Sequence, residues 1–287
     1  MARIYILGAG NPTPTAERFG SCYVVEVGRE YVMFDCGPAA THKLVKAGLR
    51  PTQIDYLFFT HHHFDHDVDY PCFLLTRWDQ GAGRESELQV YGPTLTEAIT
   101  AGIIGENGLF AHDWKARVHN PVSQRTFVSR GGTLPRRPPS VKVKDVGPGL
   151  VHRGQTWQVT AALAEHNQPW LDSLAYRLDS AEGSVVVTGD TQPCQTVVDL
   201  ARGADVMLCM CWGDDHEAMS EKGKAGGECG TTGAARMAQE AAVKKLVLVH
   251  LGPRISSHGP LEKGLGDVAE LYDGEVVFAE ELMTLEV

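Results

Sequence analysis

The sequence has few of the features that mark membrane or secreted proteins. Its N-terminal apolar run, Ile4 to Leu7, is too short for the core of a signal peptide or for a membrane span. The seven cysteines are scattered and include no Cys-x-x-Cys pair, so they predict reduced thiols rather than a disulfide framework or a zinc ribbon. No internal repeat or low-complexity tract occurs. We therefore expect a cytoplasmic protein with no membrane association.

Positive charge is also scarce, since 26 Lys and Arg stand against 36 Asp and Glu, which gives a formal net charge of −10. Nucleic-acid binding usually depends on a basic surface, so this balance argues against a nucleic-acid partner. The stretch 125–144 is a local exception, because it contains no acidic residue. It is either a solvated loop or a contact for an anionic substrate or partner. Its basic residues are Arg125, Arg130, Arg136, Arg137, Lys142 and Lys144.

Two common catalytic or cofactor motifs are missing. No Gly-x-Ser-x-Gly sequence provides a serine nucleophile. Gly8 and Gly10 follow an apolar run, but Thr13 stands where a dinucleotide-binding fingerprint has its third glycine. Pro12 and Pro14 also disfavour the helix start that would hold a pyrophosphate. These absences argue against a serine hydrolase and against a dinucleotide-binding protein.

What the sequence does contain is an alternation of short apolar runs with helical patterns, as in an α/β protein whose sheets are covered by helices. Runs rich in β-branched and aromatic residues predict strands at 3–7, 22–27, 30–35, 55–60, 88–92, 184–190, 205–210, 245–250 and 275–280. Helices are predicted at 41–47, 94–104, 194–201, 232–242 and 261–272. We expect one domain over residues 1–287, with a loop insertion around 112–150, which is rich in Pro, Gly and Arg.

The densest cluster of metal-binding side chains is "FFTHHHFDHDVDYP", residues 58–71, directly after a predicted strand. Alternate side chains of a loop leaving a strand can face one point, which favours a set of four ligands with His62 turned away. These ligands are His61, His63, Asp65 and His66. Imidazole nitrogens and carboxylate oxygens suit zinc and other first-row divalent ions. Four ligands are too many for one catalytic ion that keeps an open position, so the motif predicts two adjacent ions.

Three later residues each follow a predicted strand or apolar run, namely His166, Asp190 and His250. Because folds place their chemistry at strand ends, we expect them to join the first four. A solvated polar loop is the alternative for residues 61–66, but it leaves these three unexplained. Asp35, just before Gly37, either supports a ligand histidine through a hydrogen bond or belongs to a simple turn.

The order of these ligands resembles that of the metallo-β-lactamase superfamily. The stretches "LGAGNPTPTAERFGSCYVV", "FDCGPAATHKLVKAGLRPTQIDYLFFTHHHFDH" and "GDTQPCQTVVDLARGADVML" are similar to its ribonuclease Z branch. The resemblance implies an αββα sandwich with the metal ions at one edge of two sheets. It also implies that His61, His63 and His166 hold one ion, that Asp65, His66 and His250 hold the other, and that Asp190 bridges them.

This ligand set predicts two Zn²⁺ ions per chain, with Mn²⁺ or Fe²⁺ as alternatives. A water shared by the two ions falls in pKa towards about 7 and supplies a bridging hydroxide. Asp65, a ligand that also neighbours this water, is the expected catalytic residue, because it can orient the water and accept a proton.

The chain departs from the tRNA-processing members of this branch at two places. Where those members have a His-Glu pair, this sequence has Cys209 and Met210, and a further His is replaced by Glu228 or Cys229. Both expected proton-transfer partners are therefore missing, which argues against tRNA cleavage. Aromatic and polar residues follow two of the ligand-bearing segments and are predicted to contact substrate. They are Asn167, Trp170 and Trp212. For the tryptophans, the alternative is a place in the core or in an interface.

We therefore predict a homodimeric dinuclear zinc hydrolase that uses a metal-bridging hydroxide on a small organic molecule. The candidate substrates are a phosphodiester, an ester or lactone, or an activated aryl halide, as in hydrolytic dehalogenases. The first alternative is a tRNA 3′-processing endonuclease, or ribonuclease Z. The second is a non-enzymatic metal-binding protein, which the presence of all seven ligands disfavours.

Overall fold

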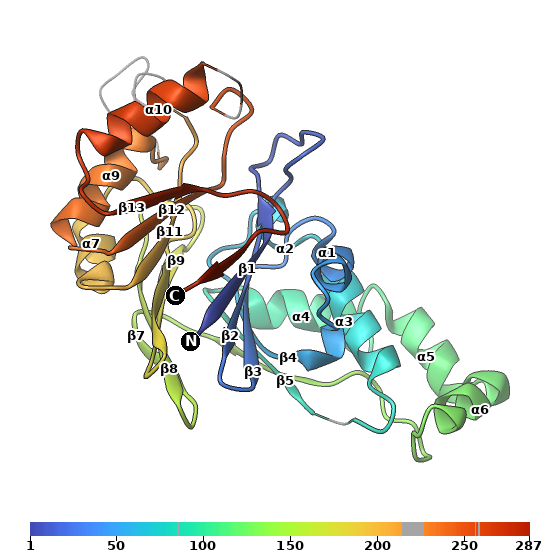
Figure 1. Cartoon of the computed structure of the whole chain (residues 1–287). Coiled ribbons are helices and arrows are strands. Elements are labelled where there is room, and N and C mark those ends of the chain that lie inside the picture. The colour runs from blue at the N-terminus through green and yellow to red at the C-terminus, as the bar shows by residue number, and fades with distance from the viewer. Residues whose placement is uncertain (85, 214–226, 256, 258) are drawn as a thin grey trace.

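Two seven-stranded sheets form the centre of the molecule (Figure 1). The computed structural model describes residues 1–84, 86–213, 227–255, 257 and 259–287. The first sheet has the order β14-β1-β2-β3-β4-β5-β6 and the second the order β13-β12-β11-β10-β9-β8-β7. The strands of the first sheet are β1 (Arg3–Ala9), β2 (Ser21–Val27), β3 (Glu30–Phe34), β4 (Ile54–Phe58), β5 (Leu88–Gly92), β6 (Val141–Asp145) and β14 (Thr284–Glu286). Those of the second are β7 (Gly149–Arg153), β8 (Trp157–Leu163), β9 (Leu174–Ser180), β10 (Gly183–Val187), β11 (Val206–Met210), β12 (Lys245–Val249) and β13 (Glu275–Phe278).

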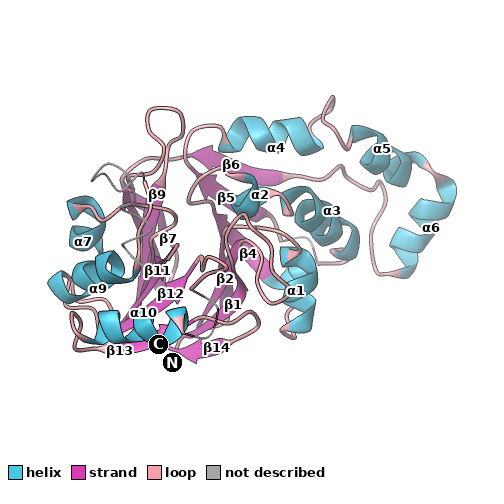
Figure 2. Cartoon of the chain, turned by 90° about the horizontal axis from the view of Figure 1, so that it is seen from above, coloured by secondary structure: helices cyan, strands magenta, loops and turns pink. Residues whose placement is uncertain are grey.

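Helices cover the outer faces of both sheets, so the layers run helix, sheet, sheet, helix (Figure 2). On the side of the first sheet lie α1 (Ala40–Lys46), a 3₁₀ turn (Pro51–Gln53), α2 (Phe64–Asp67), α3 (Tyr70–Gln80) and α4 (Thr96–Ile104). On the side of the second lie α7 (Gln195–Ala201), α9 (Thr231–Glu240) and α10 (Pro260–Ala269). This arrangement confirms the predicted α/β class and the αββα sandwich.

The main core lies between the two sheets and is rich in aromatic rings. Phe58 of β4 is fully buried, and its ring centroid lies 5.5 Å from that of Phe34, 5.0 Å from that of Tyr91 and 5.5 Å from that of Tyr176. Alternation along each strand sends one set of side chains into this layer and the other set against the helices. Because Tyr176 belongs to the second sheet, these ring contacts join the two sheets directly.

The direction of the strands brings the carboxyl ends of several strands to the same edge of each sheet. β3, β4, β5 and β6 are mutually parallel, as are β10, β11, β12 and β13. β8 and β10 are both antiparallel to β9, so they run in the same direction as each other. The segments that follow β4, β8, β10 and β12 therefore leave their sheets where functional loops of α/β folds are usually found.

The segment 112–150 differs from the predicted loop insertion. It contains most of α5 (Ala111–His119), α6 (Pro121–Ser129), β6 and the beginning of β7, and the two helices project from the end of the first sheet (Figures 1 and 2). The apolar pattern is weak because α5 buries only Ala111 and Trp114 and α6 only Phe127. Asn120 caps α6 by accepting hydrogen bonds from two backbone N–H groups, and Pro121 occupies its first turn.

The division of the chain into a single domain, 1–287, stays a prediction. Among the described residues, no helix is long and apolar enough to cross a membrane.

The aromatic layer between the sheets generates a prediction for stability. Replacing Phe58 by Ala removes a ring that is 0% exposed, so we expect the free energy of unfolding to fall by about 3–5 kcal/mol. Urea denaturation monitored by circular dichroism measures this change. Val45, 58% exposed on α1, provides the control, because Val45→Ala should change the free energy by no more than about 0.5 kcal/mol. Equal effects of both substitutions would contradict the assignment of Phe58 to the core.

Candidate metal centre

The residues after β4 form a tight turn that buries a carboxyl group and an imidazole ring. His63 precedes the one-turn helix α2, on which Asp65 and His66 are 1% exposed. The turn packs against the segment after β3, where the backbone N–H of Cys36 donates to the carbonyl of His66 (2.6 Å). Gly37 permits this approach, because a Cβ at that position would lie 2.2 Å from the carbonyl oxygen of Asp65. Glycine is therefore required where the two segments meet.

Backbone hydrogen bonds between the sheets lie beside the clustered side chains. The N–H of Leu174, in β9, donates to the carbonyl of Thr60 (2.9 Å), directly before His61. The N–H of Leu251 donates to the carbonyl of Ala9 in β1 (2.9 Å), directly after His250. Residues from both sheets are thereby held at one edge.

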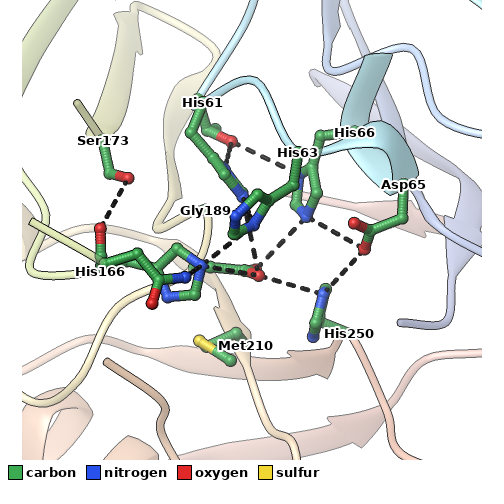
Figure 3. A network of polar contacts seen from close by, with 12 residues as sticks. His61, His63, Asp65, His66, His166, Ser173, Gly189, Met210 and His250 are labelled. Carbon is green, nitrogen blue, oxygen red and sulfur yellow. Dashed lines mark hydrogen bonds and ion pairs between the residues drawn. The ribbon is translucent and has the colours of Figure 1, made fainter. Parts of the chain in front are cut away.

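All seven predicted ligands lie at this edge, in two groups (Figure 3). Within each group, the candidate ligand atoms lie within 4.8 Å of one another. The first group is His61, His63, His166 and Asp190, and the second is Asp65, His66 and His250. Asp190 lies between them, since its Oδ1 is 3.4 Å from Nε2 of His66 and its Oδ2 is 3.2 Å from Nε2 of His250.

The donor set fits divalent ions in both groups. Asp65 Oδ1 is buried and has no hydrogen-bond partner among the described residues, and His66 Nε2 and Asp190 Oδ1, which face each other at 3.4 Å, are buried without forming a hydrogen bond. Buried polar atoms are normally satisfied, so these atoms point to ligands from outside the chain. Imidazole nitrogens with carboxylate oxygens are a zinc-type donor set.

His62 is turned away from both groups, as predicted. Its Nδ1 lies 3.2 Å from Oδ2 of Asp67, and its Nε2 lies 2.8 Å from Oγ1 of Thr96.

The electrostatics of the cluster reflect its burial. Burial, followed by the charge of His66, holds the pKa of His61 well below its usual value and favours the neutral imidazole that binds metals. Burial works against a charge on Asp190, but His250 and His66 outweigh it and hold the pKa of Asp190 well below its usual range. Asp190 is therefore ionised at neutral pH and offers a negatively charged ligand.

Asp35 makes the hydrogen bond that was one of its two predicted roles. Its Oδ2 lies 2.8 Å from Nδ1 of His66, and its Oδ1 accepts from the backbone N–H of Thr60 (2.7 Å). The hydroxyl of Thr60 also lies 3.1 Å from Nδ1 of His61. Asp35 and Thr60 thus orient two ligand imidazoles so that their other nitrogens face the centre.

The predicted substrate contacts take different positions around the centre. Asn167 has a left-handed backbone (φ 57°), and its Nδ2 lies 3.0 Å from Nε2 of His166. Trp212 is partly buried, with its ring centroid 6.4 Å from that of His250. Trp170 is 91% exposed, so the core alternative does not apply to it.

Further residues around the centre were not assigned this position from the sequence. Nδ1 of His166 lies 2.8 Å from the carbonyl of Gly227 and 3.9 Å from Oε1 of Glu228. Burial, followed by the charge of Asp190, raises the pKa of Glu228 to about 7. Met210 is buried, and its Sδ accepts from the backbone N–H of Thr191 (2.9 Å). The resemblance left open whether Glu228 or Cys229 replaces a histidine of the family, and the structure places Glu228 beside His166. The contact with Gly227, 61 positions after His166, could be shown only by the fold.

Comparison with known proteins identifies the family. Residues 15–218 match the metallo-beta-lactamase superfamily. A ribonuclease Z from Mycobacterium sp. (strain KMS) is 31% identical over 264 residues, covering 89% of this chain and 86% of the relative. A ribonuclease Z from Methanosarcina mazei is 28% identical over 312 residues, covering 100% and 98%.

Solved structures share the fold over the same length. The metallo-beta-lactamase fold protein YhfI from Bacillus subtilis superposes with a TM-score of 0.73 at 19% identity, covering 100% of this chain and 99% of that one. The short form of human tRNase Z gives a TM-score of 0.67 at 21% identity, covering 99% of both chains. At these identities the likeness establishes the fold alone.

The relatives contradict one prediction. We expected a small-molecule substrate and no nucleic-acid partner, but the relatives are named ribonuclease Z, for an activity on RNA. The net charge of −10 was misleading because it averages over the whole surface and says little about a local contact. The replaced His-Glu pair was given too much weight, since Cys209 and Met210 are buried at 0% and 1% exposure beside an intact ligand set.

The contact between Asp35 and His66 generates a prediction for metal affinity. Asp35→Asn keeps the volume but removes the charge that orients His66, so we expect metal affinity to fall about 10- to 100-fold. Competition with a chromophoric chelator measures it. Asp67→Asn is the matched control, because Asp67 pairs with His62, which lies outside both ligand groups. Comparable losses in both variants would contradict the role of Asp35.

The match to residues 15–218 covers well over half of the sequence, and the ligand order and the sandwich agree with it. The chain belongs to the metallo-beta-lactamase superfamily and, as a homologue of ribonuclease Z, is a metal-dependent hydrolase.

Proposed function

We propose that this chain cleaves phosphodiester bonds in RNA and that a tRNA precursor, cut at its 3′ side, is its substrate. The observation that carries this proposal is the full-length similarity to ribonuclease Z, at 31% identity over 89% of the chain and 86% of the relative. The match to the Methanosarcina mazei relative covers 100% of this chain, so it extends over the segments that carry the seven clustered ligands and over both sheets.

Two zinc ions fit the proposed activity best, with Mn²⁺ or Fe²⁺ as alternatives. His61, His63 and His166 would hold one ion and Asp65, His66 and His250 the other, with Asp190 between them. When bound, such ions supply Lewis acidity and positive charge that offsets the charge of a phosphodiester.

Asp65 is the proposed catalytic residue. Its Oδ2 lies 3.2 Å from Nε2 of His250, which leaves Oδ1, buried and without a described partner, to orient the attacking water and accept its proton. Asp65 is held rigidly, because its backbone packs against Gly20 and Gly37. A fixed acceptor reduces the reorganisation needed when the proton moves.

Glu228 is proposed to provide the carboxyl group on the leaving side. The two residues that replace the family's His-Glu pair, Cys209 and Met210, are both buried and point to no acid at that place. Glu228 instead lies behind His166, with Oε1 3.9 Å from its Nδ1 and Oε2 buried without a described partner. It is close enough to the centre that burial and then the charge of Asp190 raise the pKa of its carboxyl group. From this position its carboxyl group can donate a proton to the departing ribose oxygen.

Two features outside the centre suit a polyanion with unpaired bases. Trp170 follows His166 by four residues and is 91% exposed, as expected for a ring on which a base stacks. Asn167 and Trp212 would contact the nucleotides next to the cleaved bond. Residues 105–145, which include the projecting helices, contain eight basic and three acidic residues, a net charge of +5 within a chain of −10. This segment can contact phosphates.

The ligand set generates a prediction for metal content. We expect close to two ions per chain after zinc reconstitution, because each group supplies three or four suitable ligands. Elemental analysis on protein purified without chelator measures this number. His250→Ala should reduce it to about one, since it removes one ligand of the three-residue group. His62→Ala is the control and should leave it unchanged. One ion or none in the parent protein would contradict the two-ion site.

The proposed activity is tested with a precursor tRNA that carries a 3′ trailer. We expect the zinc-loaded protein to release the trailer by endonucleolytic cleavage, seen by gel electrophoresis. Asp65→Asn should lower the cleavage rate by at least about 100-fold, because the proton acceptor is lost. Circular dichroism and metal analysis must show that the variant is folded and loaded.

Asp67→Asn, in the same short helix but outside both ligand groups, should cleave at the parent rate. If the parent protein with two bound ions leaves several precursor tRNAs intact, the proposed substrate is wrong. A loaded Asp65→Asn variant with full activity would exclude Asp65 from the mechanism.

A further inference from the structure

A second cavity lies at the opposite edge of the first sheet from the metal centre. It has a volume of about 360 Å³ and is bordered by Thr52, Leu88 and Val141, at or just before the amino ends of β4, β5 and β6. The metal ligands His61, His63, Asp65 and His66 instead follow the carboxyl end of β4. The cavity is thus separate from the site described above. Its volume falls within the range of about 300–1,000 Å³ that is typical of small-ligand pockets.

Much of the cavity wall is apolar and includes two aromatic rings. The helices and strand ends contribute Leu74, Trp78, Leu88, Ile104, Phe127 and Val141. Trp78 is fixed in place, because its Nε1 donates to the carbonyl of Arg137 (3.0 Å). Such a wall suits a ring-shaped or otherwise apolar group of a ligand.

Arg136 gives the cavity a buried cation with unused hydrogen-bonding capacity. Its side chain is 4% exposed, and the guanidinium carbon lies 4.0 Å from the ring centroid of Trp78 and 4.9 Å from that of Phe127. Its Nη2 donates to Oδ1 of Asp79 (2.8 Å), but its Nε is buried with no hydrogen-bond partner among the described residues. An unsatisfied buried donor on a charged group is unfavourable, which marks Arg136 as incomplete without an added acceptor.

The charges around the cavity favour an anion. Asp79 is shared by Arg136, Arg117 (3.3 Å) and Arg130 (3.1 Å), so one carboxylate faces three guanidinium groups. At the cavity itself, Arg84 and Arg137 are exposed and form no ion pair with a described carboxylate.

The one acidic side chain among the described lining residues is already neutralised. Glu87 forms an ion pair with Lys142 at 2.9 Å and forms no described ion pair with Arg84 or Arg137. Within the described part of the lining, positive charge therefore exceeds negative charge.

We propose that this cavity binds a nucleotide unit, with the base against the apolar wall and the phosphate near Arg84, Arg136 and Arg137. A nucleotide has a flat ring, which suits the apolar wall, and an anionic group with several acceptor oxygens, which suits the arginines. It is either a free nucleoside monophosphate or one residue of a bound RNA strand. The site acts in binding and takes no part in hydrolysis.

The test is isothermal titration of the intact zinc-loaded protein with AMP, adenosine, inorganic phosphate and a five-nucleotide oligoadenylate. We expect saturable binding of one AMP per chain, with adenosine and phosphate each at least about tenfold weaker. Arg84→Gln combined with Arg137→Gln should weaken AMP binding at least about tenfold, because two charged donors are lost. If the oligoadenylate displaces AMP, the ligand of the cavity is one residue of an RNA strand. If it does not, the ligand is a free nucleotide.

The matched control combines Arg29→Gln with Arg153→Gln, which removes the same charge from exposed positions that lie outside residues 105–145 and do not line the cavity. It should bind AMP as the parent does. AMP binding that is unchanged in the Arg84/Arg137 variant would locate the nucleotide elsewhere, the metal centre included, and would overturn the proposal. So would the lack of saturable AMP binding, or phosphate binding as tightly as AMP. Asp65→Asn should bind AMP normally, so failure of RNA cleavage leaves this test unaffected.

Discussion

Backbone hydrogen bonds between the two sheets are the constraint on which the metal centre depends. Thr60, the residue before His61, accepts from Leu174 in the second sheet, and Leu251, the residue after His250, donates to Ala9 in the first. Each bond is 2.9 Å long and lies between buried residues, so each fixes a ligand-bearing segment against the opposite sheet. His61 and His250 follow strands of different sheets, and these bonds hold the two strand ends against each other. The aromatic contacts of Phe58 and Tyr176 maintain the same layer spacing further inside.

The centre itself is electrostatically costly. Asp35, Asp65 and Asp190 are all buried, within a cluster of imidazoles from His61, His66 and His250. Buried carboxylates that lack compensation are strongly unfavourable, and one oxygen each of Asp65 and Asp190 has no hydrogen-bond partner among the described residues. Divalent ions would supply the missing positive charge. The buried carboxylates therefore lower the stability of this region, while the surrounding contacts hold the ligands in a preorganised arrangement.

The sequence predicted those parts of the structure that have strong local signals. The strand Ile54–Phe58 was visible as an apolar run, and the ligands after it were visible from their spacing. β6 and β7 were missed because they are largely exposed and lack a continuous apolar face, and α5 and α6 because each buries only one or two residues. β8 and β9 were missed although they are largely buried, because polar residues interrupt their apolar runs. The resemblance pointed to Glu228 or Cys229 at one position of the site, but the choice between them and the contact of Glu228 with His166 required the folded chain. Substrate class was mispredicted because net charge does not report where the charges lie.

The projecting helices α5 and α6 give the molecule an uneven distribution of charge. Residues 105–145 carry +5, which leaves −15 on the rest of the chain. Because this segment projects from one end of the first sheet, the protein is an electrostatic dipole (Figure 1). A polyanion in solution is repelled by most of the surface and attracted by this end, so encounters are oriented before any contact forms. Added salt screens this attraction and repulsion, so it would slow productive association. The rate of the chemical step in molecules already bound would stay unchanged.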